Sequence, residues 1–266
     1  MVTKQTSHKA LMVGCGKMGG ALLEQWIRSD KLDFTVVDPM AESLPEGARL
    51  LKDQDALKNE MFDLIIVAIK PQLIEKVLPS YSKRLNKEGL VLSMAAGFSA
   101  TGLGKVMETD RVARIMPNLP SMIGKGVAGL FAMENVSQSY RDLLQHMMEL
   151  AGTSVWVDSE DGLDRITAVA GSGPGYVFEF ARTYVEAAES LGFSNEQARD
   201  LVLGTILGTI EMAQSSNETL ETLRNNVTSK NGTTEAGLNA LNQDGAVTRK
   251  LKETVDAAYN RAVELR

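Results

Sequence analysis

The chain has little of the chemistry on which several common classes of protein depend. It contains one cysteine, Cys15, in 266 residues, which excludes an intrachain disulfide framework and fits a reducing compartment. No apolar stretch approaches the roughly 20 residues that a membrane-spanning helix needs. The opening segment MVTKQTSHKA lacks the apolar core of a signal peptide. We therefore expect a soluble cytoplasmic protein that does not bind membranes.

Positive charge and histidine are also scarce. The 28 lysine and arginine residues are outnumbered by 34 acidic residues, and no segment concentrates positive charge, which argues against a nucleic-acid partner. Of the two histidines, His8 is expected in a disordered N-terminal tail and His146 on the surface of a helix or half-buried there. No spacing of ligand residues suggests a metal. The sequence therefore predicts no metal site and no catalytic acid–base pair.

The first part of the chain alternates short apolar segments with segments of helical spacing. Continuous apolar runs, rather than alternating ones, are typical of a parallel sheet that is covered on both faces. We expect a helix over 137–151 and strands at 10–14, 34–38, 63–71, 90–97, 111–118, 126–132 and 153–158. Residues 1–158 are thus predicted to form one doubly wound α/β domain.

Strand signals disappear after Asp161. The segment that follows looks helical except for a break at GSGPG, residues 171–175, and a capping box is expected where Gln197 follows Ser194. Gly204 and Gly208 lie one helical turn apart, which allows another helix to approach, either from a partner chain or within one subunit. Since α/β units are followed by a run of helices, we predict a second, all-α domain over 159–266.

A glycine-rich loop follows the first expected strand. The pattern GxGxxG alone is weak evidence in a chain with 23 glycines. Here it links a strand to a helix, and Asp38 ends the next strand, which completes a dinucleotide-binding fingerprint. The alternative is a tight turn that binds no ligand. The expected cofactor-binding residues of this loop are Gly14, Cys15, Gly16, Lys17 and Met18.

Asp38 bears on the identity of the cofactor. A carboxylate at this position can accept hydrogen bonds from both ribose hydroxyls and would repel a 2′-phosphate. No arginine or lysine follows until Arg49. We expect NADH or NADPH as the cofactor, with NADH favoured. The alternative role for Asp38 is a simple turn residue before Pro39.

Further cofactor contacts are expected where the other strands end, because ligands of open α/β sheets bind at the carboxyl ends of the strands. Small residues there leave room for ribose and nicotinamide. Asn118 could anchor the carboxamide or a backbone turn, and Lys70 could merely pack its stem along the strand. The expected residues are Ala68, Lys70, Pro71, Ala95, Gly97 and Asn118.

The stretch NVTSKNGTTEAGL, residues 226–238, places a row of hydroxyl groups directly ahead of a helix. Ser229, Thr233 and Thr234 offer hydroxyl donors, and a turn at Asn231 and Gly232 can present backbone N–H groups. Together with a helix N-terminus, such a loop suits a small anion. The alternative is a helix start that is capped by a threonine.

Several separate motifs resemble those of the pyrroline-5-carboxylate reductase family, from about residue 10 onwards. They are VGCGKMGGAL, AIKPQ, SMAAGFS, MPNLP, AGSGPGYVFEF and VTSKNGTTEAGL. The last is the most specific, although Lys230 and Asn231 stand where proline and glycine are common in the family. Gly175 similarly stands where alanine is usual.

The resemblance implies a Rossmann-type N-terminal domain and a C-terminal helical dimerisation domain. It further implies a dimer or a ring of dimers, with the substrate site formed where two subunits meet. The implied activity is the NAD(P)H-dependent reduction of the cyclic imine 1-pyrroline-5-carboxylate to L-proline, the last step of proline biosynthesis. Alternatives are a reductase of another cyclic imine on the same scaffold, a related hydroxy-acid dehydrogenase, or a non-catalytic NAD-binding regulator.

The resemblance and the hydroxyl-rich loop together define the expected substrate site. A protonated cyclic imine accepts hydride readily, so the protein mainly has to orient it in a dry pocket. Thr234 is the expected catalytic residue, through a hydrogen bond to the ring nitrogen. The expected substrate-binding residues are Ser229, Gly232, Thr233, Thr234, Gly173 and Pro174.

Overall fold

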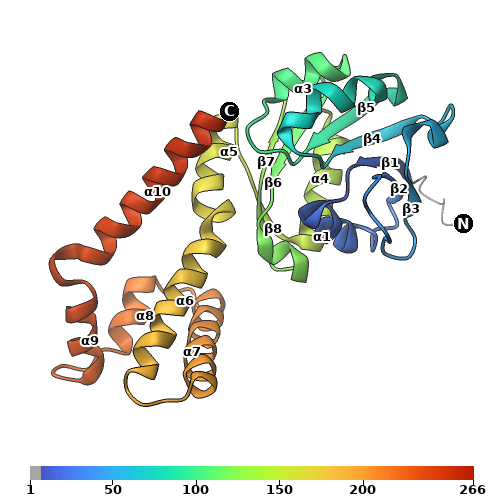
Figure 1. Cartoon of the computed structure of the whole chain (residues 1–266). Helices are drawn as coiled ribbons and strands as arrows, with labels where there is room; N and C mark the ends of the chain where they lie inside the picture. Colours follow the sequence, from blue (N-terminus) through green and yellow to red (C-terminus); the bar gives the residue numbers. More distant parts are fainter. Residues whose placement is uncertain (1–6) are drawn as a thin grey trace, which may run out of the picture. The chain divides into compact units, whose positions relative to one another are not determined.

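Eight strands form one sheet in residues 7–266, the part of the computed structural model that is described (Figure 1). Their order is β3-β2-β1-β4-β5-β6-β7-β8. The first six follow the order of the Rossmann fold, in which the direction of winding reverses between β1 and β4. The strands are β1 (His8–Val13), β2 (Leu32–Val37), β3 (Arg49–Leu51), β4 (Phe62–Val67), β5 (Leu85–Ser93), β6 (Val112–Met116), β7 (Gly126–Ala132) and β8 (Gly152–Trp156). The predicted doubly wound α/β fold is confirmed.

Both faces of this sheet are buried. Met12 belongs to the apolar cluster under α1 and α4, whereas its neighbour Leu11 belongs to the cluster under α2 and α3. Successive side chains of a strand point to opposite faces, so a strand covered on both sides reads as one continuous apolar run. The helices of this part are α1 (Lys17–Trp26), α2 (Ile74–Val77), α3 (Ala100–Met107) and α4 (Gln138–Ala151), with short helices η1 (Gln54–Leu57), η2 (Pro71–Leu73), η3 (Leu78–Arg84) and η4 (Leu119–Ile123).

One strand pair departs from the predicted parallel arrangement. β7 runs antiparallel to β6, with Ala113 opposite Ala132, whereas β8 again runs parallel to β7. Only η4 and its flanking residues connect β6 to β7, and so short a connection permits an antiparallel neighbour but not a parallel one. The strand β3 was not predicted, because its three residues form too short an apolar run.

His8 is not part of a disordered tail, and that prediction is wrong. It is the first residue of β1, where it pairs with Leu32, and its ring lies 5.7 Å from the ring of Tyr140. Its backbone N–H donates to the Lys31 carbonyl at 2.8 Å. Hydrogen bonding to the neighbouring chain segment therefore starts β1 two residues before its first buried apolar residue, Ala10. The remainder of the predicted tail, residues 1–6, lies outside the described residues.

The chain divides into two compact units. The first comprises the described residues up to Pro174 together with Ala258–Arg266, and we call it the sheet unit; the second, Gly175–Ala257, we call the helical unit. The predicted capping box is present, since Ser194 accepts from the Gln197 N–H and Gln197 from the Ser194 N–H. The remaining helices are α5 (Glu160–Ile166), η5 (Thr167–Gly171), α6 (Gly173–Glu189), α7 (Asn195–Ser215), α8 (Leu220–Asn226), α9 (Thr233–Leu241), η6 (Gln243–Gly245) and α10 (Ala246–Leu265). None of these described helices is long and apolar enough to cross a membrane.

Candidate cofactor and substrate sites

The three glycines of the GxGxxG loop meet three different structural demands. Gly14 has a left-handed φ of 84°, and a Cβ added there would lie 2.6 Å from the Ile69 side chain. Around Gly16 there is open space, with no atom within 4 Å of an added Cβ, whereas at Gly19 the Ala68 Cβ would lie 3.1 Å away. These are the tight turn, the open approach to the backbone and the close helix–strand contact of a dinucleotide-binding loop.

The N-terminus of α1 fits the phosphates of a dinucleotide. Gly16 is the N-cap, no side chain caps the first turn, and no acidic residue lies in that turn. The first N–H groups of a helix lack intrahelical acceptors, and the helix dipole favours negative charge there. Gly16, Lys17 and Met18 could therefore hold a pyrophosphate.

Asp38 lies beside this loop. Its Oδ2 accepts a hydrogen bond from the Cys15 N–H at 2.6 Å, and its Oδ1 accepts from the N–H groups of Met40 and Ala41 at 2.7 and 3.1 Å. The carboxylate thus ties the glycine loop to the end of β2 and closes its own turn. Since a carboxylate has about four lone-pair sites, it retains capacity for a further donor such as a ribose hydroxyl.

Cys15 is suited to packing and not to nucleophilic chemistry. Burial raises the pKa of the Cys15 thiol, and the carboxylates of Asp38 and Glu24 raise it further. The thiolate is the nucleophilic form, so these surroundings keep the side chain in its unreactive state.

Lys52 is a neighbour of this site that sequence reasoning missed. β3 lies parallel to β2, and the Asp38 N–H donates to the Leu51 carbonyl at 3.0 Å. Lys52 therefore follows β3 next to Asp38, and its Nζ donates to the carbonyl of Ala41. Because β3 was not predicted, nothing in the sequence placed this lysine beside the turn after β2.

The ends of β1, β4 and β5 lie side by side. The Ala68 N–H donates to the Val13 carbonyl at 2.9 Å, and the Met94 N–H donates to the Val67 carbonyl at 3.2 Å. Ala68 thus lies at the strand-order reversal at which Rossmann folds bind dinucleotides, and Ala95 follows the neighbouring strand β5. Lys70 is exposed, and Pro71 occupies the first position of η2.

Asn118 anchors backbone, one of the two roles predicted for it. Its Nδ2 donates to the Ala170 carbonyl at 3.1 Å, and its Oδ1 accepts from the Val127 N–H at 2.8 Å. The buried amide thereby joins the end of β6 to β7 and to η5.

The structure gives a local reason for glycine at position 97. It has a left-handed φ of 73°, and a side chain there would collide with the Leu265 carbonyl at the end of α10. The left-handed conformation disfavours other residues, and the cofactor contact of Gly97 stays a prediction.

The break predicted at GSGPG begins earlier than expected. Thr167–Gly171 form the π-helical turn η5, in which the Ser172 N–H donates to the Thr167 carbonyl at 2.8 Å. Gly173 and Pro174 then begin α6, and proline is tolerated in the first turn of a helix, where its missing N–H has no partner to lose. Gly173 and Pro174 stay predicted substrate contacts.

The hydroxyl-rich loop ahead of α9 is a tight turn. The Gly232 N–H donates to the Ser229 carbonyl at 3.0 Å, and among the central residues Asn231 alone has a positive φ, 59°. Negative φ followed by positive φ defines a type II turn, whose preferred central residues are proline and glycine. Asparagine is one of the few residues that tolerate the left-handed region. Lys230 and Asn231 therefore form a turn of the type that proline and glycine favour.

Helix α9 starts without a side-chain cap. Its N-cap is Gly232, and no side chain accepts a hydrogen bond from its first turn, so the alternative of a threonine cap is wrong. The first amides of α9, at Thr233 and Thr234, have no acceptor one turn back. Both threonine side chains are exposed. The helix start thus leaves donors and hydroxyls available to an anion.

The amides of the turn itself are not available, contrary to prediction. Besides the bond from Gly232 to Ser229, the Asn231 N–H donates to Glu235 Oε2 at 2.6 Å. The N–H groups of Asn231 and Gly232 are thus used in hydrogen bonds that hold the loop in its conformation.

His146 contacts a serine hydroxyl in the described chain. His146 is half-buried and its Nε2 lies 3.0 Å from Ser29 Oγ, as expected for a helix residue. Within residues 7–266 there is no group of three His, Cys, Asp or Glu side chains that could hold a metal ion.

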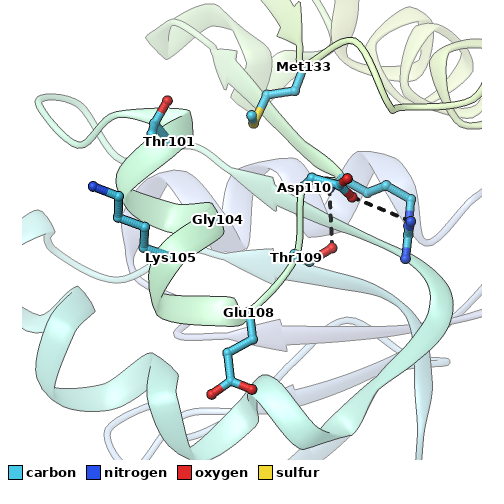
Figure 2. Close-up of a pocket in the computed structure, with 8 residues that line it drawn as sticks. Thr101, Gly104, Lys105, Glu108, Thr109, Asp110 and Met133 are labelled. Carbon is cyan, nitrogen blue, oxygen red and sulfur yellow. Dashed lines mark hydrogen bonds and ion pairs between the residues drawn. The ribbon is translucent and has the colours of Figure 1, made fainter.

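The hollow shown in Figure 2 is separate from these sites. Most of its lining, from Gly104 to Arg111, directly precedes β6, so it lies where the parallel strands begin, whereas the glycine loop lies where they end. Arg111 is engaged there, since it donates to the carbonyls of Lys87 and Gly89. The hollow therefore lies away from the end of the sheet at which Rossmann folds bind dinucleotides.

A Rossmann strand order, a complete dinucleotide loop at the strand reversal and an appended helical unit define a nicotinamide-dependent oxidoreductase. The family model for pyrroline-5-carboxylate reductase dimerisation matches residues 160–265, and the model described as NADP oxidoreductase coenzyme F420-dependent matches residues 10–97. The pyrroline-5-carboxylate reductase of Haemophilus influenzae is 33% identical over 97% of this chain and 98% of the relative. That of Pseudomonas aeruginosa is 36% identical over 76% of this chain and 74% of the relative. The chain belongs to the pyrroline-5-carboxylate reductase family.

Solved structures agree over the whole chain. The pyrroline-5-carboxylate reductase of Coxiella burnetii superimposes with a TM-score of 0.88 at 32% identity, covering 98% of this chain and 99% of the other. The enzyme of Plasmodium falciparum, solved with NADP bound, has the same fold, with a TM-score of 0.84 at 24% identity over 97% of this chain and 98% of the other. The two-part fold is thus shared from end to end.

Proposed function

We propose that this protein reduces 1-pyrroline-5-carboxylate to L-proline. Family membership supports the activity, and one observation carries the assignment of the substrate loop: α9 begins without a cap, behind a type II turn, with Thr233 and Thr234 exposed. An uncapped helix start attracts a carboxylate. Ser229 and Thr233 hold that carboxylate, and Gly232 keeps the turn close because a side chain there would meet the Ser229 hydroxyl.

The reaction adds a hydride to the carbon of the protonated imine and leaves the nitrogen as a neutral amine, which then takes up a proton from solvent. The reduced nicotinamide, when bound, supplies the hydride. An imine that enters already protonated needs no strong acid from the protein, which agrees with the prediction that there is no catalytic acid–base pair. Thr234 donates or accepts one hydrogen bond at the ring nitrogen and so orients the imine carbon. Orientation alone can lower a barrier by several kcal/mol.

Steady-state oxidation of NADH, and then of NADPH, by the purified protein with pyrroline-5-carboxylate tests this function, with proline identified as the product. Thr234→Val should lower kcat/KM by about tenfold to a hundredfold, since a hydrogen bond to a charged group contributes about 1.5–3 kcal/mol. Thr234→Ser, which keeps the hydroxyl, is the matched control and should stay within a few fold of the wild type. Absence of turnover by the wild type would refute the function, and a fully active Thr234→Val would refute only the role of Thr234.

NADH is the proposed preferred cofactor. Asp38 supports this preference, because its carboxylate stands at the end of β2 beside the glycine loop and would repel a 2′-phosphate. Lys52 opposes it, because its ammonium contacts the same turn through Ala41. The ratio of kcat/KM for NADH to that for NADPH should exceed one, fall in Asp38→Asn, and rise in Lys52→Met. A wild-type preference for NADPH would overturn the role given to Asp38.

A dimer is the proposed unit of assembly, with a ring of dimers as its further association. The helical unit exposes large apolar side chains such as Phe178 (63% exposed) and Leu207 (57%), and exposed apolar patches mark interaction surfaces. Gly204 and Gly208 face open space, with no atom within 4 Å of an added Cβ. Within one subunit, therefore, no other helix packs against these two glycines. The cytoplasm is the proposed compartment, on the basis of the single cysteine.

A further inference from the structure

Arg114 is a buried cation in the middle of an apolar strand. It belongs to β6, and its side chain is 3% exposed. Removing a guanidinium from water costs several kcal/mol unless charged and hydrogen-bonding partners compensate. The apolar spacing of RVARIMPN gives no hint of such partners, and the sequence analysis assigned Arg114 no role.

Glu160 is the charged partner of Arg114. The Nη1 of Arg114 lies 2.7 Å from Glu160 Oε1, and its Nη2 donates to the Ala95 carbonyl at 3.1 Å. The same Oε1 accepts the N–H of Ala100, the first residue of α3, at 2.7 Å. One ion pair thus holds both ends of the segment Ala95–Ala100, which connects β5 to α3.

The segment Ala95–Ala100 lies at the cofactor edge of the sheet. It leaves β5 beside the end of β4, where the Met94 N–H donates to the Val67 carbonyl. Gly97 within it has a left-handed φ of 73°, a conformation that glycine adopts readily. A segment so placed, at the carboxyl ends of the strands, borders the bound dinucleotide.

We propose that the Arg114–Glu160 ion pair is a positioning device that fixes the Ala95–Ala100 segment for cofactor binding and hydride transfer. The proposal rests on the proposed function for its catalytic consequence, but its structural consequence stands independently. Buried ion pairs contribute little net stability relative to well-packed apolar residues of similar size. Stability alone therefore gives no reason for a charged pair here. The hydrogen bonds of the pair to the Ala95 carbonyl and the Ala100 N–H do give one.

The double variant Arg114→Met/Glu160→Leu separates positioning from stability. It removes both charges together, so it should unfold at a temperature close to that of the wild type. Amide hydrogen exchange of Ala95–Ala100, measured with and without NADH, should become faster and lose its protection by NADH. With pyrroline-5-carboxylate, kcat should fall by about tenfold to a hundredfold, the cost of a small misplacement of reacting groups. Arg114→Lys, which keeps both charges of the pair, should show only part of the loss.

Arg111→Met is the matched control. Arg111 also donates to backbone carbonyls, those of Lys87 and Gly89, but it does so where the strands begin. Its loss should leave the exchange of Ala95–Ala100 unchanged. Wild-type exchange and wild-type kcat in the folded double variant would overturn the proposal. Should the double variant not fold, Glu160→Gln decides: faster exchange of the segment supports positioning, and unchanged exchange overturns it.

The same experiment distinguishes the two proposals. A wild-type protein that does not reduce pyrroline-5-carboxylate, while the double variant still shows faster exchange of Ala95–Ala100, would refute the proposed function and support positioning. Turnover by the wild type with unchanged exchange and unchanged kcat in the folded double variant would refute positioning and leave the function standing.

Discussion

The sheet unit and the helical unit bury their apolar residues very differently. Trp26, Phe34 and Leu64 are at most 1% exposed in one of the two clusters that cover the sheet. In the helical unit, by contrast, the buried apolar residues of the described chain are Ala181, Ala198 and Val202, all small or medium in size. The sheet unit therefore has a core of its own, whereas the helical unit leaves most of its large apolar side chains without a partner.

The helix α7 illustrates the difference. It exposes Leu201, Leu203, Leu207, Ile210 and Met212 on several sides. A helix that is apolar on several sides is stable in water only when other elements cover it. The hydrophobic contribution of these residues thus becomes available on self-association, which agrees with the match of this region to a dimerisation family model.

The largest effect is expected from a change inside the core of the sheet unit. Trp26→Ala should lower the free energy of unfolding by about 3–5 kcal/mol, because the side chain is fully buried and its removal leaves a cavity. The remaining tryptophan, Trp156 in β8, reports unfolding by fluorescence in a denaturant titration. Met61→Ala, at a 40% exposed position of the same unit, should change the value by less than about 0.5 kcal/mol. An equal effect of both changes would show that the core is not well packed.

The next effect concerns association of the helical unit. Leu207→Glu places a charge on the exposed apolar side of α7 and should weaken association by about 2 kcal/mol or more, as for a central interface residue. Sedimentation velocity measures the loss. Met61→Glu, an exposed apolar position in the sheet unit, is the matched control and should associate as the wild type does. An unchanged assembly of Leu207→Glu would remove α7 from the interface.

The smallest effect comes from a glycine that geometry does not require. Gly175 lies in the first turn of α6, lacks a positive φ and has open space around an added Cβ. Gly175→Ala should raise the free energy of unfolding by about 0.5–1 kcal/mol, because it restricts the unfolded chain. Gly14→Ala is the contrasting control and should destabilise, since a side chain there clashes with Ile69. Thermal unfolding compares the two, and a destabilising Gly175→Ala would point to a contact made only in the assembled protein.

Local pattern was enough to predict most of the sheet unit. The apolar runs and the GxGxxG loop predicted strands, helices and turn, because each depends on residues close in the chain. Strand direction at β7, the three-residue β3 and the partners of Arg114 depend on pairings between distant segments, which periodicity does not encode. Lys52 was missed for the same reason, since only the pairing of β3 with β2 brings it to Asp38.

In the substrate loop, the sequence predicted the backbone shape but not which donors are free. Its turn and helix start were expected from Gly232 and the hydroxyl residues, and the left-handed Asn231 explains why the turn tolerates the change from glycine. The use of the Asn231 N–H by Glu235 was not predictable, because it depends on a side-chain rotamer of the helix that follows. Which donors remain for a ligand was therefore decided by the structure and not by the sequence motif.

Amide hydrogen exchange of the full-length protein, followed from nanomolar to micromolar concentration, tests the contrast between the two units most directly. Amides of β1 and β4 should keep their protection on dilution, whereas those of α7 should lose protection as the assembly dissociates. Protection of α7 that is unchanged in the dissociated chain would contradict the account, because the helical unit would then be stable without a partner.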